Sequence, residues 1–251
     1  MISIEVSVLV FILLFGGALL GMYFDPFPAT DQLKVETRTH VQVAVGLLTS
    51  MFALLLSLQL SSGKTNFDTQ EQDVTVMASK ILILDRVLVH YGPEAQGARE
   101  TIRQAVIDLL NQVWPMERSA TSTWEPRTEA GDKVYDKIQQ LSPGNDEQRL
   151  ERALALNMAV DLGQMRWKSA ARIRSSTAVP LMIVEITWAT IIFVSFGLLA
   201  PRNATVIVSL GVCAAAVSGG FFLIVELNTP FSGLLHASSA PFRETLKYLA
   251  R

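Results

Sequence analysis

The sequence contains very little cysteine and unusually little charge. Its single cysteine, Cys213, leaves no intrachain disulfide and no cysteine-based zinc site. Aspartate, glutamate, lysine and arginine make up 18% of the 251 residues, whereas a soluble domain carries about 25%. The formal net charge of −2 gives no indication of a nucleic-acid partner, and we expect none. Half of the residues are hydrophobic, which favours a membrane protein.

Motifs for catalysis and cofactor binding are also missing. The two glycine-rich phosphate-binding patterns, G-x-x-x-x-G-K-S/T and G-x-G-x-x-G, do not occur in the sequence. His40, His90 and His236 stand far apart, and no paired carboxylate or cysteine accompanies them at metal-ligand spacing. Ser238 and Ser239 lie near His236 but lack the glycines of a nucleophile elbow. We therefore expect no enzyme, no bound metal and no cofactor.

Four windows almost free of charge follow from this composition. They cover residues 2–22, 41–60, 179–200 and 204–227. Each can cross about 30 Å of hydrocarbon as a helix that rises about 1.5 Å per residue. The first window has no basic segment before it and no clear cleavage site after it, so we interpret it as a retained helix. The predicted fold class is an all-α integral membrane protein with four transmembrane helices.

The distribution of lysine and arginine predicts the threading of these helices. Basic residues gather in 61–178 and 228–251, whereas the loops 23–39 and 200–203 contain few. By the positive-inside rule, a helical domain (61–178) inserted between helices 2 and 3 is cytoplasmic, as are both termini and the C-terminal tail (228–251). Transmembrane helices 1 and 2 lie within residues 1–60, and transmembrane helices 3 and 4 lie within residues 179–227. Pro201, Arg202 and Asn203 form a tight external turn, in which Pro201 ends one helix, Arg202 is solvated and Asn203 caps the next.

An apolar seam at heptad spacing marks the first part of the cytoplasmic domain. Its members are Phe67, Val74, Met77, Ile81, Leu84, Leu88 and Tyr91. Such a seam forms either a helical core within one subunit or a contact between subunits. Gly92 and Pro93 end this helix. Further helices are predicted over 93–113, over 132–141 after a loop at 114–131, and from a cap at Asn145 or Asp146 to about residue 175.

Three glutamates lie within the predicted spans, where ionisable groups are costly. Glu5, Glu185 and Glu226 all fall in the cytoplasmic third of the bilayer under this threading. One interpretation is that they snorkel or pair with Lys64, Arg172 or Arg174. The other is a ring of carboxylates at an inner mouth, which would favour cations if it lined a pore.

The second span has one small, weakly polar helical face. Its members are Gln42, Gly46, Thr49, Ala53, Ser57 and Ser61. Small residues permit close helix packing, which is one interpretation. The alternative is a face that lines a water path in an oligomer. A similar face on the fourth span, around Gly211 and Ser218, is interpreted as packing.

Three stretches carry a resemblance to a known family. They are LDRVLVHYGPEA (84–95), APRNAT (200–205) and the PFSGL and SSAP segments within 230–241. The sequence resembles a large bacterial family of four-helix membrane proteins known as bestrophin-like, over nearly its whole length.

The resemblance implies a homo-oligomeric ion channel of the bacterial cytoplasmic membrane, for which a pentamer is one arrangement. The lipid bilayer and inorganic ions are then its partners, and span two lies around the axis. The resemblance also implies an apolar constriction of the ion path. A second face of span two, with Val45, Phe52 and Leu56, is an alternative to the small face as the source of this constriction. Asp68, Asp85 and Arg86 are interpreted as residues that hold the cytoplasmic helices together. The alternative function is a non-conducting membrane scaffold or sensor that acts through those helices.

Overall fold

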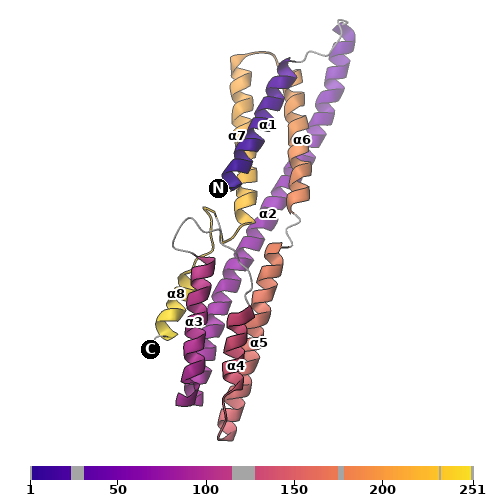
Figure 1. Cartoon of the computed structure of the whole chain (residues 1–251). Helices are drawn as coiled ribbons and strands as arrows, with labels where there is room; N and C mark the ends of the chain where they lie inside the picture. Colours follow the sequence, from indigo (N-terminus) through magenta and orange to yellow (C-terminus); the bar gives the residue numbers. More distant parts are fainter. Residues whose placement is uncertain (1, 24–30, 115–127, 175–177, 232, 250–251) are drawn as a thin grey trace. The chain divides into compact units, whose positions relative to one another are not determined.

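The computed structural model describes residues 2–23, 31–114, 128–174, 178–231 and 233–249. These residues form helices and no strand. The elements are α1 (Ile2–Tyr23), α2 (Asp31–Tyr91), η1 (Pro93–Ala95), α3 (Gln96–Val113), α4 (Thr128–Gln139), α5 (Asp146–Arg174), α6 (Ala178–Leu199), α7 (Ala204–Leu227) and α8 (Ala240–Leu249) (Figure 1).

The chain divides into two compact units, each described here by itself. Unit 1 comprises Met1–Asn66 and Ser176–Asn228, and unit 2 comprises Phe67–Ser175 and Thr229–Arg251. Four helices (α1, α2, α6 and α7) are long and apolar enough to cross a membrane, and all four contribute to unit 1. The predicted fold class is confirmed.

Helices α1 and α6 approach so closely that two glycines are required. A Cβ on Gly197 would overlap the carbonyl oxygen of Ala18, and one on Gly21 would overlap that of Val194. Only a residue without a side chain lets the two backbones meet at these points. The predicted spans α1 and α6 therefore pack through small residues. The small faces that the sequence analysis identified lie on the second and fourth spans instead.

Helix α7 is joined to α1 by polar contacts as well as by packing. The Ser3 hydroxyl donates a hydrogen bond to the Glu226 carboxylate, and Ser7 Oγ donates to the Ser218 carbonyl oxygen over 3.0 Å. Gly211 accommodates the ring of Phe15. Part of the small face of α7 is thus used in packing, as the sequence predicted.

The turn between α6 and α7 holds the end of α1. Arg202 Nε donates to the Met22 carbonyl oxygen over 2.9 Å, and its Nη2 donates to that of Tyr23 over 3.2 Å. These carbonyls belong to the last turn of α1, where a cation also interacts favourably with the helix dipole. The prediction of a merely solvated Arg202 was incomplete. Asn203 occupies the N-cap position of α7, but the predicted capping hydrogen bond from its side chain is absent.

The helix ends of unit 2 follow the sequence signals closely. Helix α2 ends at Tyr91, and Gly92 has a φ of 121°, which favours glycine. Asn145 Oδ1 accepts a hydrogen bond from the Gln148 backbone N–H over 2.7 Å, which confirms the predicted cap of α5. Helix α4 begins at Thr128, inside the predicted loop, and residues 115–127 of that loop lie outside the described residues.

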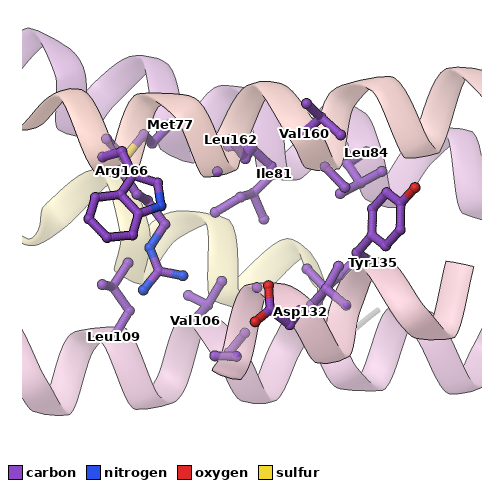
Figure 2. A pocket seen from close by; sticks show the side chains of 18 of the residues that line it. Met77, Ile81, Leu84, Val106, Leu109, Asp132, Tyr135, Val160, Leu162 and Arg166 are labelled. Atoms are coloured by element: carbon purple, nitrogen blue, oxygen red, sulfur yellow. The ribbon is translucent and has the colours of Figure 1, made fainter. Parts of the chain in front are cut away.

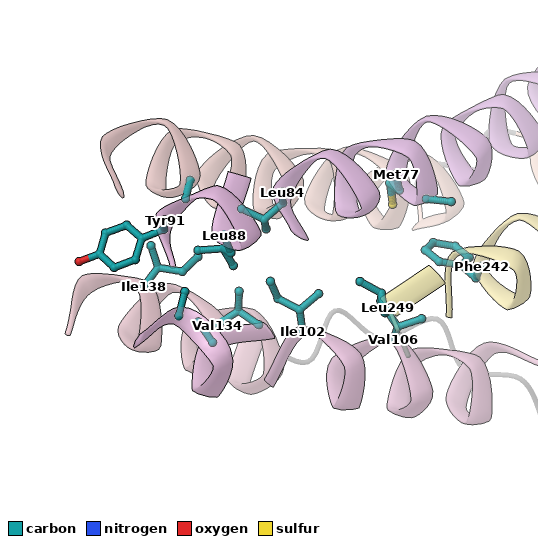
Figure 3. Close-up of a cluster of buried hydrophobic side chains, with 14 of the residues drawn as sticks. Met77, Leu84, Leu88, Tyr91, Ile102, Val106, Val134, Ile138, Phe242 and Leu249 are labelled. Atoms are coloured by element: carbon teal, nitrogen blue, oxygen red, sulfur yellow. The ribbon is translucent and has the colours of Figure 1, made fainter. Parts of the chain in front are cut away.

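The core of unit 2 is built on the heptad seam of α2. Val74, Met77, Leu84, Leu88 and Tyr91 are all buried. They pack against apolar side chains from α3, α4, α5 and α8 (Figure 3). The seam therefore forms a helical core within one subunit, which is the first of its two interpretations.

Helix α8 was missed in the predicted C-terminal tail. Phe242 is buried in the core of unit 2, and Thr245 Oγ1 donates a hydrogen bond to the Ala78 carbonyl oxygen over 3.3 Å. The sequence does contain a signal, because serines precede a proline in the first turn and apolar residues then recur at 242, 246 and 249.

Candidate functional surface

The small face of α2 lies open on the surface of unit 1. Gln42, Gly46, Ala53 and Ser57 are exposed, and Thr49 is half-buried. The Thr49 hydroxyl donates a hydrogen bond to the Val45 carbonyl oxygen of its own helix over 2.7 Å. The hydroxyl oxygen keeps its acceptor capacity, so this face can contact water or a cation without leaving a donor unsatisfied.

The alternative face of α2 points into the protomer. Val45 and Phe52 are buried, and the Phe52 ring lies 6.5 Å from that of Phe221 on α7 between centroids. Leu56 is half-buried and covers Gly220. These side chains attach α2 to the rest of unit 1, so the protomer covers most of this face.

A second exposed face of α2 was not distinguished in the sequence. We call it the apolar ridge, and it comprises Val43, Leu47, Leu54 and Leu58. The four side chains are between 65% and 73% exposed. In a membrane such a ridge contacts either lipid or a neighbouring subunit, because water is a poor solvent for it. Its members are 4, 7 and 4 residues apart in the sequence. This spacing does not stand out, because most residues of the span are apolar.

A groove adjoins the small face near the start of its apolar stretch. It has a volume of about 390 Å³. Its walls are Gln42, Val45, Gly46, Phe196, Leu199, Ala200 and Leu210. Gln42 and Gly46 therefore border a real depression between helices of unit 1, whereas Ala53 and Ser57 lie on the helix surface beyond it.

The three membrane glutamates occupy different environments. Glu5 is exposed, whereas Glu226 is 1% exposed and Glu185 is 0% exposed. Glu226 accepts the hydrogen bond from Ser3, but the Glu185 oxygens have no hydrogen-bond partner among the described residues. The side chains of Arg172 and Arg174, two of the predicted partners, lie outside the described residues.

Only Glu5 is therefore available at the surface of a single protomer. A carboxylate ring that lines an opening requires exposed oxygens, which Glu185 and Glu226 lack in the protomer. We accordingly keep Glu5 as the one candidate for such a role. Within the described part of the chain, no three histidine, cysteine or acidic side chains gather as a metal site.

In unit 2, Asp85 of the first motif is buried and forms an ion pair with the partly exposed Arg99. Arg99 Nε donates to Asp85 Oδ1 over 2.7 Å, and Arg99 Nη2 donates to Oδ2 over 3.2 Å. The hydrogen bond to Asp85 raises the pKa of Arg99, so the guanidinium stays protonated. It joins α2 to α3 across the turn at Gly92. Arg99 was missed by sequence reasoning, although it and Asp85 stand equally far from that turn.

Arg86 and Asp68, the other two residues expected to hold the cytoplasmic helices together, differ from Asp85. Arg86 is exposed and has no hydrogen bond or ion pair within the described ranges. Asp68 is also exposed. The expectation that Arg86 holds helices together therefore has no support, and Arg99 takes that role instead.

The last motif forms a closed loop attached to α3. The Ala237 backbone N–H donates to the Pro230 carbonyl oxygen over 2.7 Å. Trp114 Nε1 donates to the Ala237 carbonyl oxygen over 2.8 Å, and the Trp114 ring contacts Phe231 and Phe242. The motif thus connects the end of α3 to the start of α8, which is a structural role.

Comparison with known proteins agrees with this architecture. A family profile described as the Bestrophin-like domain matches residues 12–242. No curated protein matches the sequence.

Crystal structures with a similar fold include two mutant forms of a bacterial bestrophin homologue from Klebsiella pneumoniae. One has 14% sequence identity and a TM-score of 0.63, with 98% of this chain and 99% of that chain covered. The other has 15% identity and a TM-score of 0.63, with 97% and 98% covered. A third structure, of a membrane protein, has 13% identity and a TM-score of 0.61, with 97% of each chain covered. At these identities the likeness concerns the fold.

Proposed function

The chain belongs to the bestrophin-like family, and we propose that it forms a homo-oligomeric ion channel in the bacterial cytoplasmic membrane. It is a membrane protein with four apolar helices. The observation that carries the proposal is the small, weakly polar face of α2, which is exposed in the protomer although it belongs to a membrane span.

The polar groups of this face favour water over lipid. Gln42 and Ser57 are exposed side chains with hydrogen-bonding groups in the span. Polar side chains in a span usually face a bundle interior or a water-filled cavity, because hydrocarbon offers them no partner. An oligomer with this face toward its axis would give them water, and the apolar ridge would then contact lipid or the next subunit.

The threading in this proposal keeps both termini on the cytoplasmic side. Lys64 and Lys168 are exposed, and they belong to the basic set that favours this side. Glu5, at the start of α1, would lie near the inner opening and attract cations there. The side chains of Lys34 and Arg38, on the opposite side, lie outside the described residues.

The proposal is tested by ion flux. The purified chain is reconstituted into liposomes, and potassium and chloride gradients are imposed separately. We expect flux of at least one ion from an oligomer, and a strong reduction by Ala53→Trp, whose side chain would obstruct the path. Leu54→Trp, one position along on the apolar ridge, is the matched control and should leave flux unchanged.

The opposite result has a clear form. A monomer in both detergent and lipid, or no flux from well-folded oligomers across several pH values and calcium concentrations, would contradict the channel. Because the heptad seam is buried in unit 2, we do not propose a scaffold that binds a partner through that seam.

A further inference from the structure

Unit 2 contains an apolar pocket that no part of the proposed channel uses. Its volume is about 260 Å³, and residues of α2, α3, α4, α5 and α8 line it (Figure 2). For comparison, an engineered apolar cavity of about 150 Å³ stays dry and binds benzene. In the same proportion of volume to ligand size, a molecule of about ten non-hydrogen atoms would fill the pocket of unit 2.

The body of the pocket is aliphatic. Met77, Ile81 and Leu84 of α2 form one wall, and Leu109 and Leu162 line the pocket from α3 and α5. None of these five side chains carries a charge or donates a hydrogen bond. A charged group placed against them would lose its water without gaining a partner, which is costly. Burial of hydrocarbon surface is the favourable contribution that this wall makes, so an occupant needs a hydrocarbon body.

Two side chains of opposite charge also line the pocket, Arg166 of α5 and Asp132 of α4. Arg166 extends across the pocket toward the side where Asp132 lies (Figure 2). A Cβ on Gly131 would lie 3.5 Å from Arg166 Nη1, so the guanidinium lies against the first turn of α4. Arg166 is half-buried, and Asp132 is exposed. The pocket therefore has one polar side, to which α4 and α5 each contribute a charge.

The opposite signs of these two charges decide what kind of ligand the polar side accepts. Burial lowers the pKa of Arg166, and the nearby charge of Asp132 raises it. The arginine thus already interacts with a carboxylate of the protein. An anionic ligand would be attracted by Arg166 and repelled by Asp132, and a cationic ligand would meet the reverse. Neither sign is favoured, whereas an uncharged ligand avoids the loss of solvation that a charged one would bring.

We propose that this pocket binds a small uncharged molecule with a hydrocarbon body. The body lies against Ile81, Leu109 and Leu162, and any single hydroxyl group lies at the side of Arg166 and Asp132. The pocket belongs to unit 2, whereas the small face of α2 belongs to unit 1. The test of this site therefore does not depend on whether the chain conducts ions.

The test compares three probes that share one hydrocarbon chain. Octan-1-ol is uncharged, octanoate is anionic and octylammonium is cationic. Each is added to the full chain in nanodiscs of phosphatidylcholine, and the probes are compared at equal free concentrations. The measurement is the slowing of amide hydrogen exchange within 130–135 and 159–167, the parts of α4 and α5 that line the pocket. This measurement reports on unit 2 and not on probe dissolved in lipid.

We expect octan-1-ol to slow exchange at a concentration at least about tenfold lower than either charged probe, because a charge loses its solvation on entry. Absence of an effect of octan-1-ol would overturn the proposal. An equal or stronger effect of octanoate or octylammonium would overturn it as well.

A first pair of variants tests the location by filling the pocket. Gly163 lines it, and a Cβ there would contact no atom within 4 Å, so Gly163→Leu adds a side chain without a clash at Cβ. The effect of octan-1-ol should disappear in this variant. Gly97→Leu, at an equally open glycine outside the pocket, should retain it. An effect of octan-1-ol that persists in Gly163→Leu would overturn the assignment.

A second pair enlarges the pocket and so gives a gain that a misfolded variant cannot produce. Leu109 lines the pocket, whereas Leu110 packs against the same core from the next position of α3 without lining it. Leu109→Ala should raise the affinity for decan-1-ol relative to octan-1-ol by about tenfold, because the added methylene groups are then buried. Leu110→Ala should leave this ratio unchanged. An unaltered ratio in Leu109→Ala, or an equal rise in Leu110→Ala, would contradict the assignment.

Discussion

Gly197 of α6 lies directly against the carbonyl oxygen of Ala18 on α1, with no room for a Cβ between them. The same pair of helices has a second such contact at Gly21. The position of α1 in unit 1 therefore depends on backbone contact, which side-chain repacking cannot replace.

The first prediction concerns this contact. Gly197→Ala should destabilise the protein by about 1–3 kcal/mol, because the new methyl group forces two backbones apart. The measurement is thermal unfolding in detergent. Gly16→Ala on α1 is the control, since a Cβ there would meet nothing within 4 Å. Equal melting temperatures for the two variants would show that α1 and α6 do not pack in this way.

The second prediction concerns the ion pair of unit 2. Arg99→Gln should lower stability by about 1.5–3 kcal/mol, because it leaves the Asp85 carboxylate, which is 3% exposed, without its charged donor. Arg86→Gln removes the same charge from an exposed position and should change stability by less than about 0.5 kcal/mol. Chemical denaturation of both variants is the measurement, and an equal loss in the two would refute the assignment of Arg99.

The third prediction concerns the loop before α8. Trp114→Phe keeps an aromatic ring beside Phe231 and Phe242 but removes the donor to the Ala237 carbonyl oxygen. We expect a loss of about 1 kcal/mol and faster hydrogen exchange within 229–239. Trp114→Ala should cost several-fold more, because the ring contacts are lost as well. Exchange in this segment that Trp114→Phe leaves unaltered would contradict the hydrogen bond.

The fourth prediction concerns the end of α1. Arg202→Gln should destabilise unit 1 by about 1 kcal/mol, since the carbonyls of Met22 and Tyr23 lose a charged donor. Arg202→Lys retains the charge but cannot reproduce the planar two-point contact. Its stability should therefore lie between that of Arg202→Gln and that of the parent. If Arg202→Gln is as stable as the parent, the arginine is only a solvated charge, as the sequence alone suggested.

The elements of the fold could be predicted because each has a strong local signal. The long apolar windows predicted the spans, Gly92 predicted the end of α2, and Asn145 predicted the start of α5. The close contact at Gly197 and the partner of Asp85 could not be predicted with the same ease, because both depend on which helices become neighbours. A single sequence does not contain that information directly.

The faces of α2 show the same limit for the candidate site. Periodicity identified a small face and an alternative face with Phe52, but only the packing against Phe221 shows which of them the protomer covers. The burial of Glu185 could not be predicted from the sequence either, because a glutamate in a span can face lipid headgroups, water or protein.

The most direct test of the account is thiol block of ion flux, in a Cys213→Ala background that removes the native cysteine. Single cysteines are introduced at Ala53 on the small face and at Leu54 on the apolar ridge, and a water-soluble thiol reagent is added to reconstituted liposomes. We expect the reagent to block flux through the Ala53→Cys variant and to leave the Leu54→Cys variant conducting. Block at Leu54→Cys with none at Ala53→Cys would contradict it, because the apolar ridge would then face the ion path.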